Sequence, residues 1–239
     1  GLNMTAVIVE GRVTKEYRLP TAFEHQIASE ASEGLSCVFE DLPGGIPDEP
    51  LQPNAKGDTW CIGYGKDIFR KLFTERQLLC LGTFARTIRA VSRETGKTEH
   101  ELSLNPAVLG FLYCCLARLA DRNSQVCTWQ VGADKIGHTF TRYALPFTWD
   151  FVEVMPWADS SGGFGQAIDW VARVVEHALE ANAKAPTPTV AKMSAIGQSF
   201  TDFDLVITDP PYYDAIGYSV VMDFFSVWLR RTLAGLLPN

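Results

Sequence analysis

The chain has 239 residues, of which 46% are hydrophobic and 21% charged, and its formal net charge at pH 7 is −7. No stretch approaches the about 20 apolar residues that a membrane span needs, and no signal peptide opens the sequence. The acidic balance argues against a protein that coats nucleic acid by charge alone, although it fits an enzyme with one local basic face. Six irregularly spaced cysteines and four scattered histidines predict a reduced, cytoplasmic protein without a metal site.

The first quarter of the chain combines short strands with a long turn-rich stretch. Residues 5–19 alternate around Glu10 and Gly11, which predicts a β-hairpin, and residues 21–33 fit a short helix. Residues 41–58 are rich in proline and glycine and are typical of a loop or linker. Because the sequence begins with Gly1, we expect a fragment of a longer protein.

Two helices are predicted next. Thr74 and Gln77 have the spacing of a capping box, and apolar residues then recur at helical spacing to residue 95. Asn105 and Pro106 form a favourable N-cap and first-turn pair for a second helix, which ends near residue 121.

The second half alternates between strand and helix signals. Strands are predicted at residues 125–131, 139–144, 147–154, 190–193 and 203–208, and helices at residues 165–182 and 219–233. This alternation favours an α/β sheet. We therefore expect an irregular N-terminal segment (residues 1–65), a helical insertion (residues 66–123) and an α/β part (residues 124–239).

An unusual turn follows the apolar strand at residues 203–207. Asp209 comes directly after it, at the position where functional groups of open α/β sheets gather. Pro210 and Pro211 fix their φ angles and lack N–H groups, so the turn is stiff and presents acceptors, namely the Asp209 carboxylate and the Pro210 carbonyl. Tyr212 adds a flat aromatic face.

Acceptors beside a stacking ring suit a planar molecule that carries an amino group, such as adenine or cytosine. The lone pair of that nitrogen is delocalised into the ring, so the nitrogen is a poor nucleophile. Two acceptors placed on its hydrogens favour the pyramidal nitrogen that attack requires. An aromatic ring holds the extruded base flat, and such stacking contributes about 1–3 kcal/mol.

The stretch "DPPY" resembles the catalytic motif of S-adenosylmethionine-dependent methyltransferases that act on N6 of adenine or N4 of cytosine in DNA. With "TDPPYYDAI", "DFFSVWLRRTL", "LFTERQLL" and "LADRNS", residues 67–233 look closest to the large prokaryotic adenine-specific DNA methylases that carry an N-terminal domain of unknown function. The resemblance implies a partial Rossmann-like class I methyltransferase sheet. It also implies that Asp209 and Pro210 bind the target amine, that Pro211 completes the turn and that Tyr212 stacks on the base. The aspartate at the first position favours adenine.

The resemblance also implies S-adenosylmethionine as cofactor. The candidate cofactor loop spans residues 154–168 and includes Gly163 and Gly165, while Ser194 and Ala195 follow a strand where relatives contact the cofactor adenine. The interval from this loop to Asp209 holds fewer strands than the usual sheet order needs. We therefore also expect that the true loop precedes Gly1, in which case residues 154–168 form an ordinary surface loop.

DNA is the expected partner, and no membrane is involved. Arginines on one helix face, and a separate pair near the end of the chain, are candidates for phosphate contacts, with a solvated face as the alternative. Two residues after the motif are candidates for the base pocket, with a structural role as the alternative. These candidates are Arg86, Arg89 and Arg93, the pair Arg230 and Arg231, and the pocket residues Tyr213 and Asp214.

Two other functions remain open. The same chemistry could act on an RNA base or a protein glutamine, although those relatives more often begin the motif with asparagine. The chain could also be a non-catalytic, nucleic-acid-binding or scaffold portion.

Overall fold

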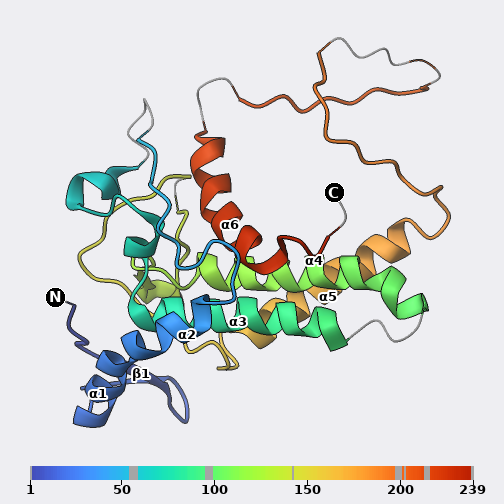
Figure 1. The fold of residues 1–239 in the computed structure, drawn as a ribbon. Coiled ribbons are helices and arrows are strands. Elements are labelled where there is room, and N and C mark those ends of the chain that lie inside the picture. Colours follow the sequence, from blue (N-terminus) through green and yellow to red (C-terminus); the bar gives the residue numbers. More distant parts are fainter. Residues whose placement is uncertain are drawn as a thin grey trace.

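The computed structural model describes residues 2–53, 59–94, 99–141, 143–196, 201, 203–212 and 216–237. Its helices are α1 (Ala22–Glu30), α2 (Leu35–Phe39), α3 (Glu75–Glu94), α4 (Glu99–Asp121), α5 (Phe164–Ala181) and α6 (Tyr218–Leu233), and its strands are β1 (Val7–Glu10), β2 (Lys15–Arg18), β3 (Trp129–Gln130) and β4 (Lys135–Ile136). Figure 1 shows them in chain order. None of the described helices is long and apolar enough to cross a membrane.

The structure is mostly helical, so the expected α/β fold with a partial Rossmann-like sheet is wrong. The described strands form two small antiparallel sheets, β1 with β2 and β3 with β4, and none of them pairs in parallel. Of the five strands predicted after residue 124, only part of the first forms, as β3. An extended segment needs a neighbour to satisfy its N–H and C=O groups, and the described chain supplies none at residues 204–208.

The predicted N-terminal hairpin is confirmed. Strands β1 and β2 pair in antiparallel register, with Val7 opposite Arg18 and Glu10 opposite Lys15. The hairpin lies against the β3–β4 sheet. There Lys15 donates a hydrogen bond of 2.9 Å to the Asp134 carbonyl, and the Trp129 indole donates one of 3.1 Å to the Tyr17 hydroxyl.

The capping box at the start of α3 is also confirmed. The Thr74 N–H donates to Gln77 Oε1 at 2.9 Å, and the Gln77 N–H donates to Thr74 Oγ1 at 3.2 Å. Both side chains are buried, with 8% and 1% of their residue surface exposed. The two side chains thus satisfy one amide at the N-cap and one inside the first helical turn.

Replacing Thr74 by alanine is expected to lower the free energy of unfolding by about 1 kcal/mol, because the Gln77 N–H loses its acceptor. Urea unfolding followed by far-ultraviolet circular dichroism measures this change. Thr74→Ser retains the hydroxyl and serves as the control, with a smaller loss. Equal losses in the two variants would show that the methyl group rather than the cap carries the stabilisation.

Helix α4 begins before the predicted start at Asn105. It runs from Glu99 to Asp121 and contains Pro106 within the helix. A proline inside a helix lacks the N–H that would bond the carbonyl four residues earlier, which is why sequence reasoning placed it in the first turn. The α4 helix extends past this position in the N-terminal direction.

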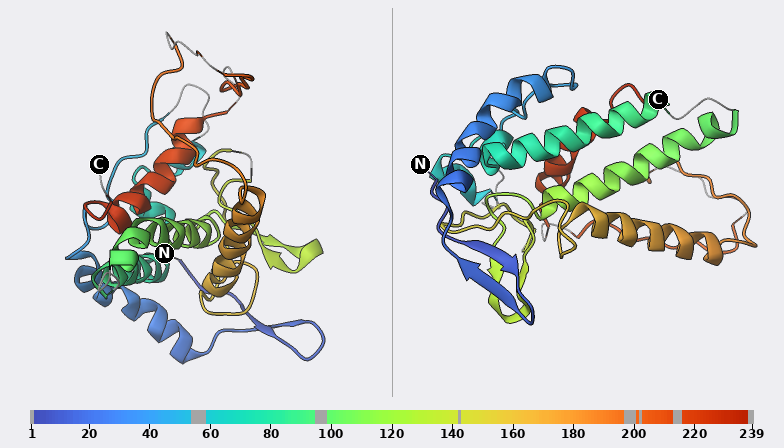
Figure 2. Two further views of the ribbon diagram at one scale, coloured as in Figure 1. Left: turned by 90° about the vertical axis from the view of Figure 1, so that its right-hand side faces the viewer. Right: turned by 90° about the horizontal axis from the view of Figure 1, so that it is seen from below.

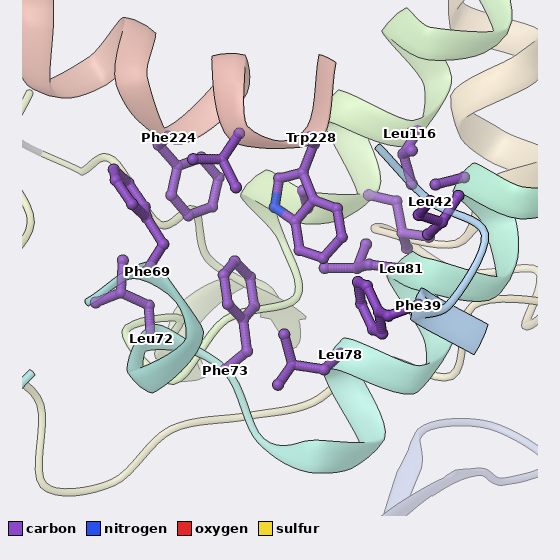
Figure 3. Close-up of a cluster of buried hydrophobic side chains, with 14 of the residues drawn as sticks. Phe39, Leu42, Phe69, Leu72, Phe73, Leu78, Leu81, Leu116, Phe224 and Trp228 are labelled. Carbon is purple, nitrogen blue, oxygen red and sulfur yellow. The ribbon is translucent and has the colours of Figure 1, made fainter. Parts of the chain in front are cut away.

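The hydrophobic core lies among α2, α3, α4 and α6 and includes the turns around Phe69 and Leu72. Figure 3 shows Phe224 and Trp228 of α6 pointing toward Phe73 and the α3 side chains Leu78 and Leu81. The Phe73 and Trp228 rings meet edge to face with centroids 5.4 Å apart, a favourable aromatic geometry. The core draws side chains from each of the three predicted parts of the chain, residues 1–65, 66–123 and 124–239.

Helix α5 packs along α4 and ends in a long connection to α6. The described residues of this connection extend away from the helices and return to the start of α6, as Figures 1 and 2 show. They include the stretch that carries Asp209. The predicted helices at residues 165–182 and 219–233 are confirmed as α5 and α6.

Candidate functional site

The Asp209–Tyr212 motif lies in the connection between α5 and α6, outside the hydrophobic core. Asp209, Pro210, Pro211 and Tyr212 are all exposed and belong to no helix or strand. The apolar residues before them are exposed as well, with Leu205 at 73%. The motif therefore follows an open, extended segment rather than a buried strand. Tyr213 and Asp214 lie outside the described residues.

The local chemistry of this turn is that of an accessible acceptor site. Pro210 and Pro211 supply no N–H donor, so the Asp209 carboxylate and the Pro210 carbonyl face the solvent without a competing donor from either proline. The Tyr212 residue is 62% exposed, which leaves its ring accessible for stacking. The turn can accept hydrogen bonds from an amino group and offer one aromatic face.

The glycine-rich loop before α5 folds upon itself. Gly162 has a φ of +102°, and a Cβ on Gly163 would lie 2.2 Å from the carbonyl oxygen of Ala158, so neither position accommodates a side chain without a shift. Gly163 is the N-cap of α5, and its N–H donates to the Ser160 carbonyl at 2.9 Å. The close approach at Gly163 is thus to the protein's own backbone. Gly165 is exposed and faces open space.

Ser194 and Ala195 do not join this loop. Both are exposed in the connection beyond the far end of α5, and the Ser194 hydroxyl accepts a hydrogen bond of 3.2 Å from the Ile196 N–H. Among the described residues, no hydrogen bond links them to Gly163 or Gly165. The four candidate cofactor residues therefore do not form a cradle that fits S-adenosylmethionine.

Two of the three helix arginines are engaged by the protein. Arg86 donates to the Cys37 carbonyl at 3.3 Å. Arg89 donates to the carbonyls of Thr232 and Ala234 at 3.1 and 3.0 Å, and it thereby caps the C-terminal end of α6. Burial, followed by the charge of Arg93, lowers the pKa of Arg89. Arg93 is exposed and the Arg86 side chain is 47% exposed, so both stay accessible to a phosphate, whereas Arg89 does not.

The arginine pair near the end of α6 divides between surface and interior. The Arg230 side chain is 60% exposed, whereas the Arg231 side chain is fully buried. Arg231 holds Glu49 through two bonds of 2.9 Å and contacts the carbonyls of Gly44 and Gly45. Only Arg230 is placed for an external phosphate contact.

A polar cluster near the end of α4 was not foreseen from the sequence. His138 Nδ1 lies 2.5 Å from Asp121 Oδ2, and Nε2 lies 3.2 Å from an Arg122 guanidinium nitrogen. Because arginine can only donate, Nε2 accepts and Nδ1–H donates to the carboxylate. The lone pair of the imidazole is thus occupied, and the cluster joins α4 to the following loop rather than supplying a base. His138 lies 17 positions after Asp121, a spacing that matches no motif.

The described site is therefore an exposed, irregular stretch that carries acceptors and one aromatic ring, separate from the glycine-rich loop. No group of three or more metal-ligating side chains gathers in the part of the chain that the structure describes. Comparison with protein-family models, curated proteins and solved structures found no match to this chain.

Proposed function

We propose that the turn at residues 209–212 binds the exocyclic amino group of a DNA base, and that the chain takes part in methylating that amine, at N6 of adenine. The observation that carries the proposal is the exposed Asp209 carboxylate beside the donor-free proline pair and the accessible Tyr212 ring. S-adenosylmethionine as methyl donor and DNA as partner are proposed on the resemblance of the motif, and the cytoplasm as location is proposed on the irregular spacing of the cysteines.

The chain's own residues perform the binding and orientation. The Asp209 carboxylate and the Pro210 carbonyl accept the two hydrogens of the amine, which draws its lone pair out of conjugation with the base. The Tyr212 ring stacks on the base plane. Their contribution is electrostatic and depends on a fixed arrangement of the two acceptors and the ring.

Replacing Asp209 by alanine in the complete protein is expected to lower methyl transfer by at least about 10²-fold, because one preorganised acceptor is lost. The assay uses radiolabelled S-adenosylmethionine with DNA, RNA and protein substrates in parallel, followed by identification of the modified group. We expect label in N6-methyladenine of DNA.

Asp204→Ala is the matched control for this experiment. Asp204 is an exposed acid of the same segment, so its removal changes the net charge equally but leaves the turn intact. Its activity is expected to stay within about twofold of the parent. Near-normal transfer by Asp209→Ala, or label in RNA or protein alone, would each contradict the proposal.

A further inference from the structure

The imidazole of His138 lies between two opposite charges at the end of α4. Its Nδ1 lies 2.5 Å from Asp121 Oδ2, and its Nε2 lies 3.2 Å from Arg122 Nη2. The His138 side chain is 45% exposed, so protons of the solvent can reach the ring. Imidazole is the side chain whose ordinary charge change falls between about pH 5 and 8. The contact with Arg122 requires the neutral ring, because a guanidinium group can only donate.

Protonation of the ring acts in opposite directions on its two contacts. An imidazolium carries a hydrogen on each nitrogen, so Nε2 can no longer accept from Arg122, and two cations then stand 3.2 Å apart. The same proton turns the Asp121 contact into an ion pair with a charge-assisted hydrogen bond. One contact is therefore lost in acid, while the other becomes stronger.

Asp121 determines which contact the charged ring keeps. Its side chain is 19% exposed, and its second oxygen, Oδ1, is buried and has no hydrogen-bond partner among the described residues. A carboxylate in this position gains from a cation beside it, because burial disfavours an unpaired charge. The charged ring therefore stays with Asp121, and Arg122 leaves.

The other groups near this contact favour the same outcome. Arg118 precedes Arg122 by one helical turn, and burial, followed by the charge of Arg118, lowers the pKa of Arg122. The thiol of Cys127, in the loop after α4, is buried, and burial raises its pKa, so it stays neutral and offers no countercharge. Toward α5, Arg122 borders the glycine-rich loop and first turn at residues 162–167, none of which titrates.

We propose that Arg122 is a proton-controlled link between α4 and the segment after β4: neutral His138 holds its guanidinium group, and protonation of His138 releases it while Asp121 keeps the ring. The element with two states is the Arg122 side chain. With the neutral ring, two side chains of α4 hold His138, and with the charged ring only one does. The inference does not depend on methyl transfer, because it rests on these three side chains alone.

Nitrogen NMR of the purified chain at about pH 8 and about pH 5 tests the proposal. The ring nitrogens of His138 report its protonation, and the exchange of the Arg122 guanidinium hydrogens with water reports whether Arg122 is held. At the higher pH we expect a ring protonated on Nδ1 alone. At the lower pH we expect both ring nitrogens protonated and the protection of Arg122 lowered by at least about tenfold, after correction for the intrinsic pH dependence of exchange.

His138→Gln supplies the matched control. A glutamine side chain offers a carbonyl oxygen to Arg122 and an amide hydrogen to Asp121, and it carries no titratable proton, so it can keep both contacts at either pH. The protection of Arg122 in this variant is expected to be the same at the two pH values. His138→Ala removes both contacts and is expected to leave Arg122 unprotected throughout. Circular dichroism verifies that both variants retain the helices.

Four results would overturn the proposal. The first is a His138 ring that stays neutral at the lower pH. The second is a ring that becomes charged while the protection of Arg122 is unchanged, which would show that Nε2 does not hold the guanidinium group. The third is loss of the Nδ1–H signal to exchange with water in acid, which would mean that the ring leaves Asp121 instead. The fourth is the same pH dependence in His138→Gln, which would make another group the sensor.

Discussion

Replacing Arg231 by methionine is expected to lower the free energy of unfolding by about 1–3 kcal/mol, because the carbonyls of Gly44 and Gly45 lose their buried donor and the Glu49 carboxylate, 26% exposed, keeps only Arg230 as a partner. Arg231 uses every N–H of its guanidinium group. It donates twice to Glu49 at 2.9 Å and once each to the carbonyls of Gly45, Gly44 and Val227, at 2.6, 3.1 and 2.9 Å. These bonds fasten the turn at residues 44–49 to α6.

Urea unfolding of the purified chain measures this loss. Arg230→Met is the neighbouring control, because the Arg230 side chain is 60% exposed and its contact with Glu49 is 3.2 Å, and exposed ion pairs contribute about 0–1 kcal/mol. Adding Glu49→Gln to Arg231→Met is expected to cost less than Glu49→Gln costs in the parent, since the two hydrogen bonds from Arg231 to Glu49 are already lost. Equal losses for Arg230 and Arg231 would contradict the assignment.

The same pair gives a pH dependence. Burial alone raises the pKa of Glu49, but the hydrogen bonds from Arg231 and the charges of Arg231 and Arg230 outweigh it and lower the pKa. A lowered pKa in the folded state means that the stabilisation is present above the ordinary carboxyl pKa and is lost as pH falls through the lowered value. The stability difference between the parent and Glu49→Gln is therefore expected to shrink in acid.

Replacing Trp228 by alanine is expected to cost about 3–5 kcal/mol, because it opens a large cavity at the centre of the core. Trp228 is fully buried, and it packs on Phe73, which in turn stacks on Phe224 with ring centroids 5.6 Å apart. Thermal and urea unfolding followed by circular dichroism at the helical band measure the change.

Trp228→Phe provides the matched comparison. The buried Trp228 Nε1 has no hydrogen-bond partner among the described residues, so phenylalanine removes volume without breaking a hydrogen bond. Its loss is expected to be less than half that of alanine. Met222→Ala, at an α6 residue that is 58% exposed, is expected to change stability by less than about 0.5 kcal/mol. A small effect of Trp228→Ala would contradict the assigned core.

The helices were predictable because local signals determine them. Thr74 and Gln77 form the predicted capping box, and the apolar periodicity located α5 and α6 to within one or two residues. The early start of α4 was missed because Pro106 carries a strong first-turn preference, which tertiary packing of the helix overrides. Helical hydrogen bonds close within a few residues, so the sequence alone contains most of the information.

The strands were not predictable in the same way. Residues 203–208 have strong β-propensity, yet a strand forms only where a second strand satisfies its backbone, and no pattern within the segment specifies that neighbour. The same limit applies to the candidate site. The chemistry of Asp209 and Tyr212 is readable from the turn, whereas the interior position of Arg231 and the Asp121–His138 link depend on contacts between distant residues.

The anchoring of α6 has a consequence for the connection that precedes it. Arg231 and Trp228 hold α6 to the bundle, and Arg89 caps its last turn, so its position does not depend on the path by which the chain reaches it. The entropy lost on closing a flexible loop rises only with the logarithm of its length, and doubling the loop costs about 0.6 kcal/mol. The helical body can therefore accommodate insertions or deletions in the part of this connection that precedes the Asp209–Tyr212 motif at little thermodynamic cost.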